Sequence, residues 1–214
     1  MIIFETLTLR NFLSFGNNTT VINLNTPGTT LILGENLDHT DHGIVSNGSG
    51  KSTILNGIVF ACYDRIIGDH TKDGLVNHFN KEQMEVSLTF KSDTGTRYKI
   101  LRQRKMKKSG GDANRTVLYE NDVDISTDST KNIAKQIEDI LGMPYEMFVR
   151  IIVFSASNDS FLSLPSTSAT GPSQKSFVEE LFGQKVVSEK ADALKLLIKD
   201  AKAELEGLKK QVEI

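Results

Sequence analysis

Asn47-Gly48-Ser49-Gly50-Lys51-Ser52-Thr53 reads as the end of a phosphate-binding loop of the Walker A pattern, G-x-x-x-x-G-K-[ST]. In such loops, consecutive backbone N–H groups surround the β-phosphate of a nucleotide, the Lys reaches the β and γ oxygens, and the Ser hydroxyl binds Mg²⁺. The helix that follows points its positive end at the same phosphates. The stretch therefore predicts an ATP site with Lys51 as the catalytic residue and Ser52 as the Mg²⁺ ligand. The rest of the loop would bind the nucleotide through Gly48, Ser49, Gly50 and Thr53.

The first glycine of the pattern is displaced along the chain. It should stand at position 45, where the chain has Val45, whereas an apolar run upstream ends at Gly34. Leaving out Leu37–Asn47 brings Gly34-Glu35-Asn36 directly before Gly-Ser-Gly-Lys-Ser and restores the motif. We therefore expect Gly34 and Asn36 to complete the nucleotide site. Asn47 takes the place of Asn36 if the insertion begins one residue earlier.

The insertion itself leaves three interpretations open. It contains Asp38-His39-Thr40-Asp41-His42, and clustered Asp and His can bind a metal. No Cys accompanies them, and their spacing fixes no tetrahedral geometry. A polar flap over the nucleotide is the second interpretation, and a solvated loop is the third. The solvated loop is favoured because surface loops tolerate insertion.

Composition excludes several classes of protein. The chain has 214 residues and a net charge of −2, so it can bury a core and its overall charge names no partner. Its one cysteine, Cys62, cannot form an internal disulfide. Charge interrupts the N-terminus too early for a signal peptide, and no apolar run has membrane-spanning length. We expect a soluble, intracellular protein with no membrane partner.

The pattern of apolar residues predicts an α/β P-loop fold with β-hairpins. Alternation predicts strands over 2–9, 21–24, 85–90, 97–104 and 116–119. Continuous apolar runs predict buried strands at 29–33, just ahead of the loop, and within 146–154. Helical spacing predicts helices over 51–66 and 130–141. The loop thus has a strand before it and a helix after it, as the motif requires.

The C-terminal part has a different character. The residues Leu194, Ile198, Ala201, Leu205, Leu208 and Val212 follow a heptad spacing. This spacing predicts the start of a long coiled coil, with a single amphipathic surface helix as the alternative. We expect residues 1–172 to form the N-terminal lobe of an ATP-binding head and residues 173–214 to form a helix leading into the coiled coil.

Two further observations concern catalysis and DNA. An ATPase needs a carboxylate on Mg²⁺, usually after a strand of four apolar residues, and no run in this chain ends in that way. The segment 97–108 is strongly basic, and Arg102, Arg104, Lys107 and Lys108 are candidates to bind DNA phosphates. The alternative is a solvated hairpin whose alternate residues, Tyr98 and Ile100, face the core.

Four stretches together resemble one family of ATPases. They are the opening Leu7–Phe15 with its Asn-Phe-x-Ser, the phosphate-binding loop, Leu141–Phe148 with the form Leu-Gly-x-x-Tyr-x-x-Phe, and Pro172 with Phe177–Phe182. In this order they resemble the Rad-fifty/SbcC family of SMC-like ABC ATPases and its phage counterpart, the large subunit of the recombination exonuclease. The resemblance covers nearly the whole chain. It implies the N-terminal lobe of an ABC/SMC head, followed by the start of an antiparallel coiled coil.

The resemblance also implies the partners that complete the site. In that family the C-terminal half of the same ATPase supplies the signature motif, the Walker B acid, the catalytic Glu and a switch His. Two heads dimerise over two ATP molecules with Mg²⁺. A separate metal-dependent, SbcD-like nuclease subunit works with the heads on DNA. The resemblance further implies a protein of the cytoplasm, in a bacterial cell or a phage-infected host.

Two positions depart from the family pattern. The Q-loop Gln, which contacts Mg²⁺ and the γ-phosphate, should follow the run Ile151–Phe154, where Ser155 stands. Its role would fall to Ser155, Asn158 or water. The basic residue that the family often has within Asn-Phe-x-Ser is Leu13 here, and Arg10 is the candidate to serve instead.

We therefore expect the ATP-binding subunit of a DNA double-strand-break repair or recombination nuclease complex. ATP-driven dimerisation of two heads would control the access of the nuclease to DNA ends, and this chain alone would bind ATP with negligible turnover. The alternative is a structural SMC-type DNA-binding ATPase without a nuclease partner, which co-purification of a nuclease would distinguish. A small P-loop kinase would need an Arg-rich lid and its own catalytic acid, and the long charged C-terminal helix argues against it.

Overall fold

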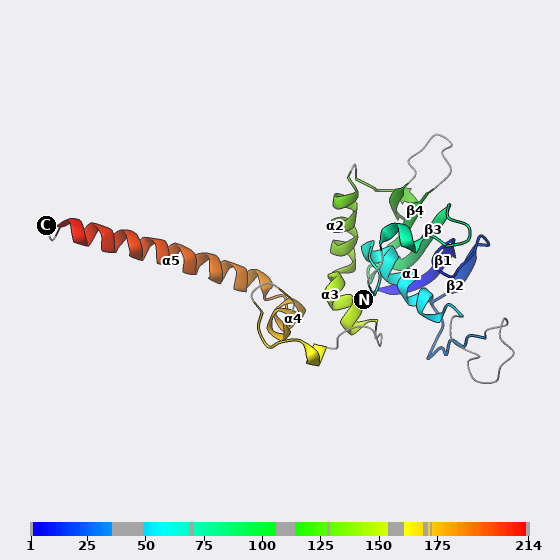
Figure 1. Ribbon diagram of the computed structural model, residues 1–214, viewed down its shortest axis with the longest axis horizontal. Helices are drawn as coiled ribbons and strands as arrows, with labels where there is room; N and C mark the ends of the chain where they lie inside the picture. Colours follow the sequence, from blue (N-terminus) through cyan, green and yellow to red (C-terminus); the bar gives the residue numbers. More distant parts are fainter. Residues whose placement is uncertain are drawn as a thin grey trace. The chain divides into compact units, whose positions relative to one another are not determined.

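The structure is a computed structural model that describes residues 2–35, 49–68, 71–105, 114–127, 129–153, 161–168, 171 and 173–212. The chain divides into two compact units, Met1–Asn158 and Asp159–Ile214. The first unit contains a six-stranded sheet and the helices that pack on it (Figure 1).

The sheet has the strand order β2-β1-β3-β4-β5-β6, and every neighbouring pair is antiparallel. The strands are β1 (Ile3–Arg10), β2 (Thr20–Asn23), β3 (Met84–Lys91), β4 (Arg97–Arg104), β5 (Arg115–Glu120) and β6 (Val123–Asp124). The helices of this unit are α1 (Lys51–Tyr63), α2 (Thr130–Leu141) and α3 (Tyr145–Ile151), with a 3-10 turn η1 (Lys72–Leu75). The five strands predicted from alternation and the helices at 51–66 and 130–141 are confirmed within a few residues. The α/β prediction is therefore confirmed.

One face of the sheet carries the core. Leu7, Leu88, Ile100 and Leu118 lie beside one another across four strands, and none of them is exposed. Helices α1 and α2 pack against the same buried cluster and against each other. Because side chains alternate across a strand, the residues between these positions point to the opposite face of the sheet. The same alternation determines which cationic side chains of β4 lie on the face opposite the core, where a ligand could reach them.

Gly57 sets how closely α1 approaches the sheet. A Cβ at this position would lie 2.8 Å from Cδ2 of Leu9 and 3.3 Å from Cδ2 of Leu7. Any larger residue would push the helix away from β1 or displace these leucines. Since α1 begins at Lys51, this close packing also fixes the position of the phosphate-binding loop.

The strand predicted within 146–154 is wrong, because Tyr145–Ile151 forms helix α3. Pro144 stands immediately before the helix, Glu146 lies in its first turn, and Arg150 pairs with Glu146 one turn later. All three features stabilise a helix. The apolar run that suggested a strand begins only at the last residue of this helix. Short apolar runs of this kind fit a helix end as well as a strand.

The strand predicted at 29–33 is also wrong within the part of the chain that the structure describes. The residues between Gly28 and Glu35 form no strand, and Leu31 and Leu33 are 79% and 81% exposed. A buried strand needs hydrogen-bonded neighbours on both sides. The described strands all belong to the antiparallel sheet, and none of them pairs with this segment.

The second unit is helical. It contains a 3-10 turn η2 (Phe161–Ser163), α4 (Gln174–Leu181) and the 28-residue helix α5 (Lys185–Val212). Ser173 caps α4 by accepting a hydrogen bond from the Ser176 N–H. Four heptad residues of α5, namely Leu194, Ile198, Leu205 and Leu208, are exposed. The predicted helix is thus present, and its apolar face carries no covering partner among the described residues.

Candidate nucleotide-binding site

The predicted phosphate-binding loop leads into the N-terminus of α1. Gly50 precedes the helix with φ +86°, a left-handed conformation that favours glycine. Thr53 N–H donates to the Gly50 carbonyl, which closes the first turn at 3.1 Å. The Lys51 ammonium donates to Ser49 Oγ at 3.2 Å, and the Ser52 side chain is exposed. The first N–H groups of α1, Lys51 and the Ser52 hydroxyl thus gather at one helix end, which suits an anion and its metal.

The two parts of the split motif meet in space. A Cβ at Gly34 would overlap Ser49 Oγ and would lie 2.7 Å from Ser49 Cβ. It would also lie 3.2 Å from Cγ of Lys51. Gly34 therefore stands beside the loop at a point where only a glycine fits. This contact supports the interpretation that Gly34 is the displaced first glycine of the motif.

A third segment, the turn after β1, also touches the loop. The hydroxyls of Ser14 and Thr53 are 3.0 Å apart and form a hydrogen bond. A Cβ at Gly50 would lie 2.9 Å from Ser14 Oγ, so the serine packs directly against the glycine. In the sequence, Ser14 stands out only as part of the segment Leu7–Phe15 that resembles the family. The contact joins residues 39 positions apart, and no local pattern reveals it.

Several predicted residues lie outside the described part of the chain. These are Asn36, Asn47 and Gly48 of the loop, Ser155 and Asn158 at the Q-loop position, and the Asp/His cluster at 38–42. Within the described residues, no group of three or more His, Cys, Asp or Glu side chains could hold a metal. Arg10, the candidate for the missing basic residue, donates to Oδ1 of Asn17 at 2.9 Å and to Oε1 of Gln83 at 3.0 Å.

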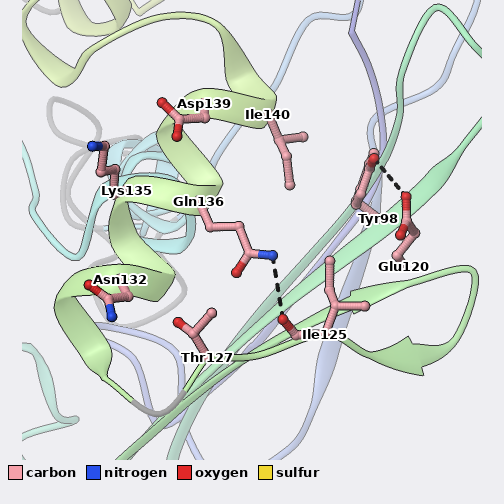
Figure 2. A pocket seen from close by; sticks show the side chains of 9 residues that line it. All are labelled: Tyr98, Glu120, Ile125, Thr127, Asn132, Lys135, Gln136, Asp139 and Ile140. Atoms are coloured by element: carbon pink, nitrogen blue, oxygen red, sulfur yellow. Dashed lines mark hydrogen bonds between the residues drawn. The ribbon is translucent and has the colours of Figure 1, made fainter.

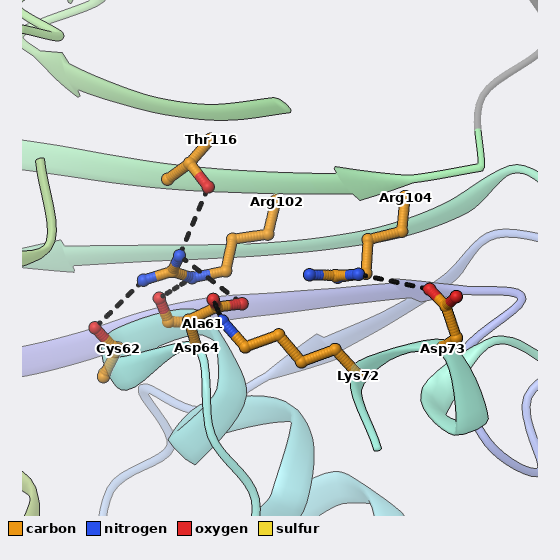
Figure 3. Close-up of polar contacts among 8 residues, drawn as sticks. All are labelled: Ala61, Cys62, Asp64, Lys72, Asp73, Arg102, Arg104 and Thr116. Carbon is orange, nitrogen blue, oxygen red and sulfur yellow. Dashed lines mark hydrogen bonds and ion pairs between the residues drawn. The ribbon is translucent and has the colours of Figure 1, made fainter. Parts of the chain in front are cut away.

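Arg102 is not a DNA-binding residue, and that prediction is wrong. Its side chain is 2% exposed and lies on the core face of β4 (Figure 3). Its guanidinium donates to the carbonyls of Ala61 at 2.7 Å and Cys62 at 3.2 Å, and to Thr116 Oγ1 at 3.2 Å. Arg102 thus binds the carbonyls at the C-terminal end of α1, which helical hydrogen bonds leave free.

The other predicted DNA contacts have different outcomes. Arg104 shares the face of Arg102, and its guanidinium lies 3.4 Å from the Asp73 carboxylate (Figure 3). Lys72, nearby, pairs with Asp64. Lys107 and Lys108 lie outside the described residues. Arg102 and Arg104 thus bind groups of the protein itself. Cations on the opposite face of β4 remain as candidates to bind DNA.

Cys62 lies beside Arg102 and is fully buried. Burial raises the pKa of its thiol to about 12, and the positive charge of Arg102 lowers the pKa only in part. At neutral pH the thiol is therefore protonated, and a protonated thiol is a poor nucleophile. Cys62 is therefore a packing residue.

The segment that resembles Leu-Gly-x-x-Tyr-x-x-Phe packs against the end of α1. The Tyr145 hydroxyl donates to the Ile66 carbonyl at 3.1 Å, and the Tyr63 hydroxyl donates to the Met143 carbonyl at 2.7 Å. The Arg65 guanidinium lies 5.0 Å from the centre of the Tyr145 ring. The two tyrosines therefore attach α3 to the helix that carries the phosphate-binding loop.

A separate open hollow of about 700 Å³ lies between the sheet and α2 (Figure 2). Tyr98 and Glu120 line it from the sheet, where the tyrosine hydroxyl donates to the carboxylate at 2.9 Å. Gln136 reaches in from α2 and donates to the Ile125 carbonyl at 3.4 Å. None of the predicted phosphate-binding residues lines this hollow, so it is distinct from the nucleotide site.

The chain matches a known protein family over nearly its whole length. Residues 6–214 match the protein family described as AAA domain. The chain belongs to this AAA-domain family. Membership confirms the predicted P-loop class of the fold.

Named relatives of this AAA-domain chain include phage and bacterial nuclease subunits. Exonuclease subunit 2 of Enterobacteria phage T4 is 30% identical over 190 residues, which are 88% of this chain and 30% of that protein. The SbcC subunit of nuclease SbcCD from Deinococcus radiodurans is 32% identical over 113 residues, which are 50% of this chain and 12% of that protein. The predicted resemblance to SbcC and its phage counterpart is thus confirmed. The chain spans less than a third of the length of these relatives.

Among solved structures, an Smc head domain with an extended coiled coil from Pyrococcus furiosus, bound to the C-terminal domain of ScpA, is 23% identical. The match has a TM-score of 0.44 and covers 68% of this chain and 35% of that one.

In the part of the chain that the structure describes, no helix is both long enough and apolar enough to span a bilayer.

Proposed function

We propose that this chain is the ATP-binding part of an ATPase subunit that works with a nuclease on DNA. The contact between Gly34 and Ser49 carries the proposal, because it joins the split motif into one loop at the start of α1. The phage relative is named an exonuclease subunit and the bacterial relative a subunit of a nuclease. ATP binding would close two heads over two nucleotides, and hydrolysis would reopen them and give the nuclease access to DNA ends.

The residues at the start of α1 suit MgATP. The backbone N–H groups of residues 48–53 would surround the phosphates, and Lys51 would balance the charge on the β and γ oxygens. Ser52 would bind Mg²⁺, which neutralises phosphate charge when it is bound. Ser155, at the Q-loop position, is the proposed second contact to Mg²⁺. Asn36 or Asn47 would complete the loop.

The catalytic acid would come from another part of the ATPase. The exposed segment Leu31-Ile32-Leu33 runs directly into Gly34 and is apolar enough for a buried strand. We propose that strands from the C-terminal half of the same ATPase cover it and bring the Walker B acid and the catalytic Glu. The exposed apolar face of α5 would pair with a returning helix in an antiparallel coiled coil.

The proposal predicts that this chain alone binds ATP but hydrolyses it with negligible turnover. The residues proposed to bind the phosphates belong to this chain, whereas the Walker B acid and the catalytic Glu are proposed to come from the C-terminal half of the ATPase. Isothermal titration calorimetry with MgATP measures binding, and release of inorganic phosphate measures turnover. A chain that folds but does not bind ATP would contradict the proposed function, and sustained turnover would contradict the proposed division of the active site.

The insertion is predicted to be dispensable for nucleotide binding. Since Gly34 already contacts Ser49, deleting Leu37–Asn47 leaves a loop of ordinary Walker A length. We expect the affinity for MgATP, measured by calorimetry, to remain within about twofold of the intact chain. Loss of binding by a deletion variant with an unchanged circular dichroism spectrum would mean that the insertion contacts the nucleotide.

DNA would lie on the outer face of the sheet, opposite α1 and α2. On β4 the core-facing positions include Ile100 and Arg102, so Lys99 points outward. Lys99 pairs with Tyr119 on β5 in register, and its ammonium lies 5.9 Å from the centre of that ring. Arg115 lies on the same face at the start of β5 and is exposed. A cation beside an aromatic ring suits nucleic acid without sequence preference.

Replacing Lys99 and Arg115 together with glutamine is expected to weaken binding to a short DNA duplex. If each cation meets one phosphate, the slope of log K against log salt should flatten by about 1.8. Fluorescence anisotropy over a salt series measures it. Lys131→Gln with Lys135→Gln makes the same charge change on exposed positions of α2 and should leave the slope unchanged. Equal slopes for both double variants would remove this face as a DNA surface.

A further inference from the structure

The turn that carries Ser14 is held by hydrogen bonds from two buried asparagine side chains. Asn11, at the end of β1, is 1% exposed, and Asn77, which follows η1, is 5% exposed. The two residues lie 66 positions apart. Asn11 belongs to the turn (residues 11–16), and Asn77 belongs to the segment 75–83 that packs against it. Buried amides are retained in proteins only where their donors and acceptors are satisfied.

Asn77 donates two hydrogen bonds to the turn and accepts two from its own loop. Its backbone N–H donates to the Asn11 carbonyl at 2.8 Å, and its side-chain NH₂ donates to the Leu13 carbonyl at 2.8 Å. Its side-chain oxygen accepts from the N–H groups of Phe79 and Asn80, each at 3.1 Å. The side chain thus joins the turn to its own loop.

Asn11 completes the connection from the other side. Its side-chain NH₂ donates to the Glu82 carbonyl at 2.8 Å. Its side-chain oxygen accepts from the Asn80 side chain at 2.7 Å. Both ends of each amide are therefore used, so the orientation of each side chain is fixed by its neighbours.

The turn needs this support because its backbone is strained. Asn11 and Leu13 both have φ +49°, a left-handed conformation that asparagine tolerates and leucine disfavours. Leu13 is held on both sides, since its N–H donates to the Leu75 carbonyl at 2.8 Å and its carbonyl accepts from Asn77. Strain of this kind persists where surrounding contacts determine the conformation.

Ser14 follows Leu13 directly, so the strained residue decides where its hydroxyl points. That hydroxyl meets Thr53 Oγ1 at 3.0 Å and packs against Gly50. Thr53 lies in the first turn of α1, where the N–H groups of the phosphate loop converge. A rigid turn behind the loop would keep these groups in place before a ligand arrives and would reduce the entropy lost on binding.

We propose that Ser14 is a positioning residue for the phosphate loop and that Asn77 holds Ser14 in place. This proposal rests on the proposed nucleotide function, because it names a residue that supports the same site. Ser14 acts through the hydroxyl of Thr53 and does not itself bind the phosphates. Neither residue belongs to the Walker A pattern, and Asn77 lies 24 positions beyond Thr53.

The test measures MgATP affinity by calorimetry in the full chain. Ser14→Ala and Asn77→Ala are each expected to weaken binding about three- to tenfold, the effect of one lost hydrogen bond. In a Thr53→Val background the Ser14→Ala change should cost less than about twofold, because the partner hydroxyl is already absent. Asn121→Ala is the matched control, since the Asn121 side-chain oxygen also accepts a backbone hydrogen bond, from Arg97, at a turn between other strands. It should bind MgATP normally.

The outcomes separate the two levels of the proposal. If the intact chain does not bind MgATP, the proposed function fails. If the intact chain binds and Ser14→Ala binds equally well, the positioning role is overturned while the proposed function stands. Equal losses from Ser14→Ala with and without the Thr53→Val change would also overturn it. Ser14 is exposed apart from this contact, so its variant reports on affinity even if Asn77→Ala fails to fold.

Discussion

Replacing Lys51 with alanine is expected to lower the affinity for MgATP roughly 10- to 150-fold. Lys51 is the first residue of α1, and its ammonium reaches back over the loop to Ser49. A hydrogen bond to a charged group contributes about 1.5–3 kcal/mol, which corresponds to this range of affinity. Alanine is a good helix former, so the start of α1 should remain intact. Calorimetric titration with MgATP measures the loss.

The matched control is Lys91→Ala. Lys91 is an exposed lysine at the end of β3 that pairs with Glu5 at 3.1 Å, away from the loop. Its removal takes away the same charge and should leave MgATP affinity unchanged. Similar affinities for Lys51→Ala and Lys91→Ala would show that the ammonium at position 51 does not contact the phosphates. The proposal that the split motif binds ATP would then be wrong.

Much of the fold follows from local patterns in the sequence. The predicted bounds of β4 and α2 agree with the structure, because β4 alternates and α2 ends at Gly142, which has φ +64°. The two wrong strands are both continuous apolar runs without alternation. A continuous apolar run indicates that a segment is buried but does not distinguish a strand from a helix. That choice depends on the elements that pack against the segment. At 29–33 that partner is not among the described residues.

The position of Arg102 could have been predicted. In the alternative interpretation of the hairpin, Tyr98 and Ile100 face the core, and because a strand repeats every two residues, Arg102 and Arg104 then share that face. The DNA-binding prediction rested on the charge of the segment, whereas the alternation along the strand determines which of its side chains are exposed. The contact of Gly34 with Ser49 followed from completing the motif. The contact of Ser14 with Thr53 could not be predicted, because it depends on how the turn after β1 meets α1.

Arg102→Met is expected to destabilise the first unit by about 3 kcal/mol or more, at about 1–3 kcal/mol for each acceptor that loses its donor. Methionine keeps an apolar side chain of comparable length but leaves three acceptors without their donor, namely the carbonyls of Ala61 and Cys62 and the hydroxyl of Thr116. A buried acceptor without a partner costs about 1–3 kcal/mol. The nearest acid, Asp64, lies 3.9 Å from the guanidinium and keeps its pair with Lys72, so the variant buries no unpaired carboxylate. Urea unfolding followed by circular dichroism measures the change.

The control lies on the same strand. Arg97, at the other end of β4, is about half exposed and pairs with Glu5 at 2.8 Å, so Arg97→Met should change stability by no more than about 0.5 kcal/mol. If both variants unfold at the same urea concentration, the buried hydrogen bonds of Arg102 do not hold α1 to β4. A large difference would mean that one buried arginine fixes the C-terminal end of the helix whose N-terminal end forms the phosphate loop. MgATP affinity of the folded Arg102→Met chain should then fall as well, because the loop depends on where that helix lies.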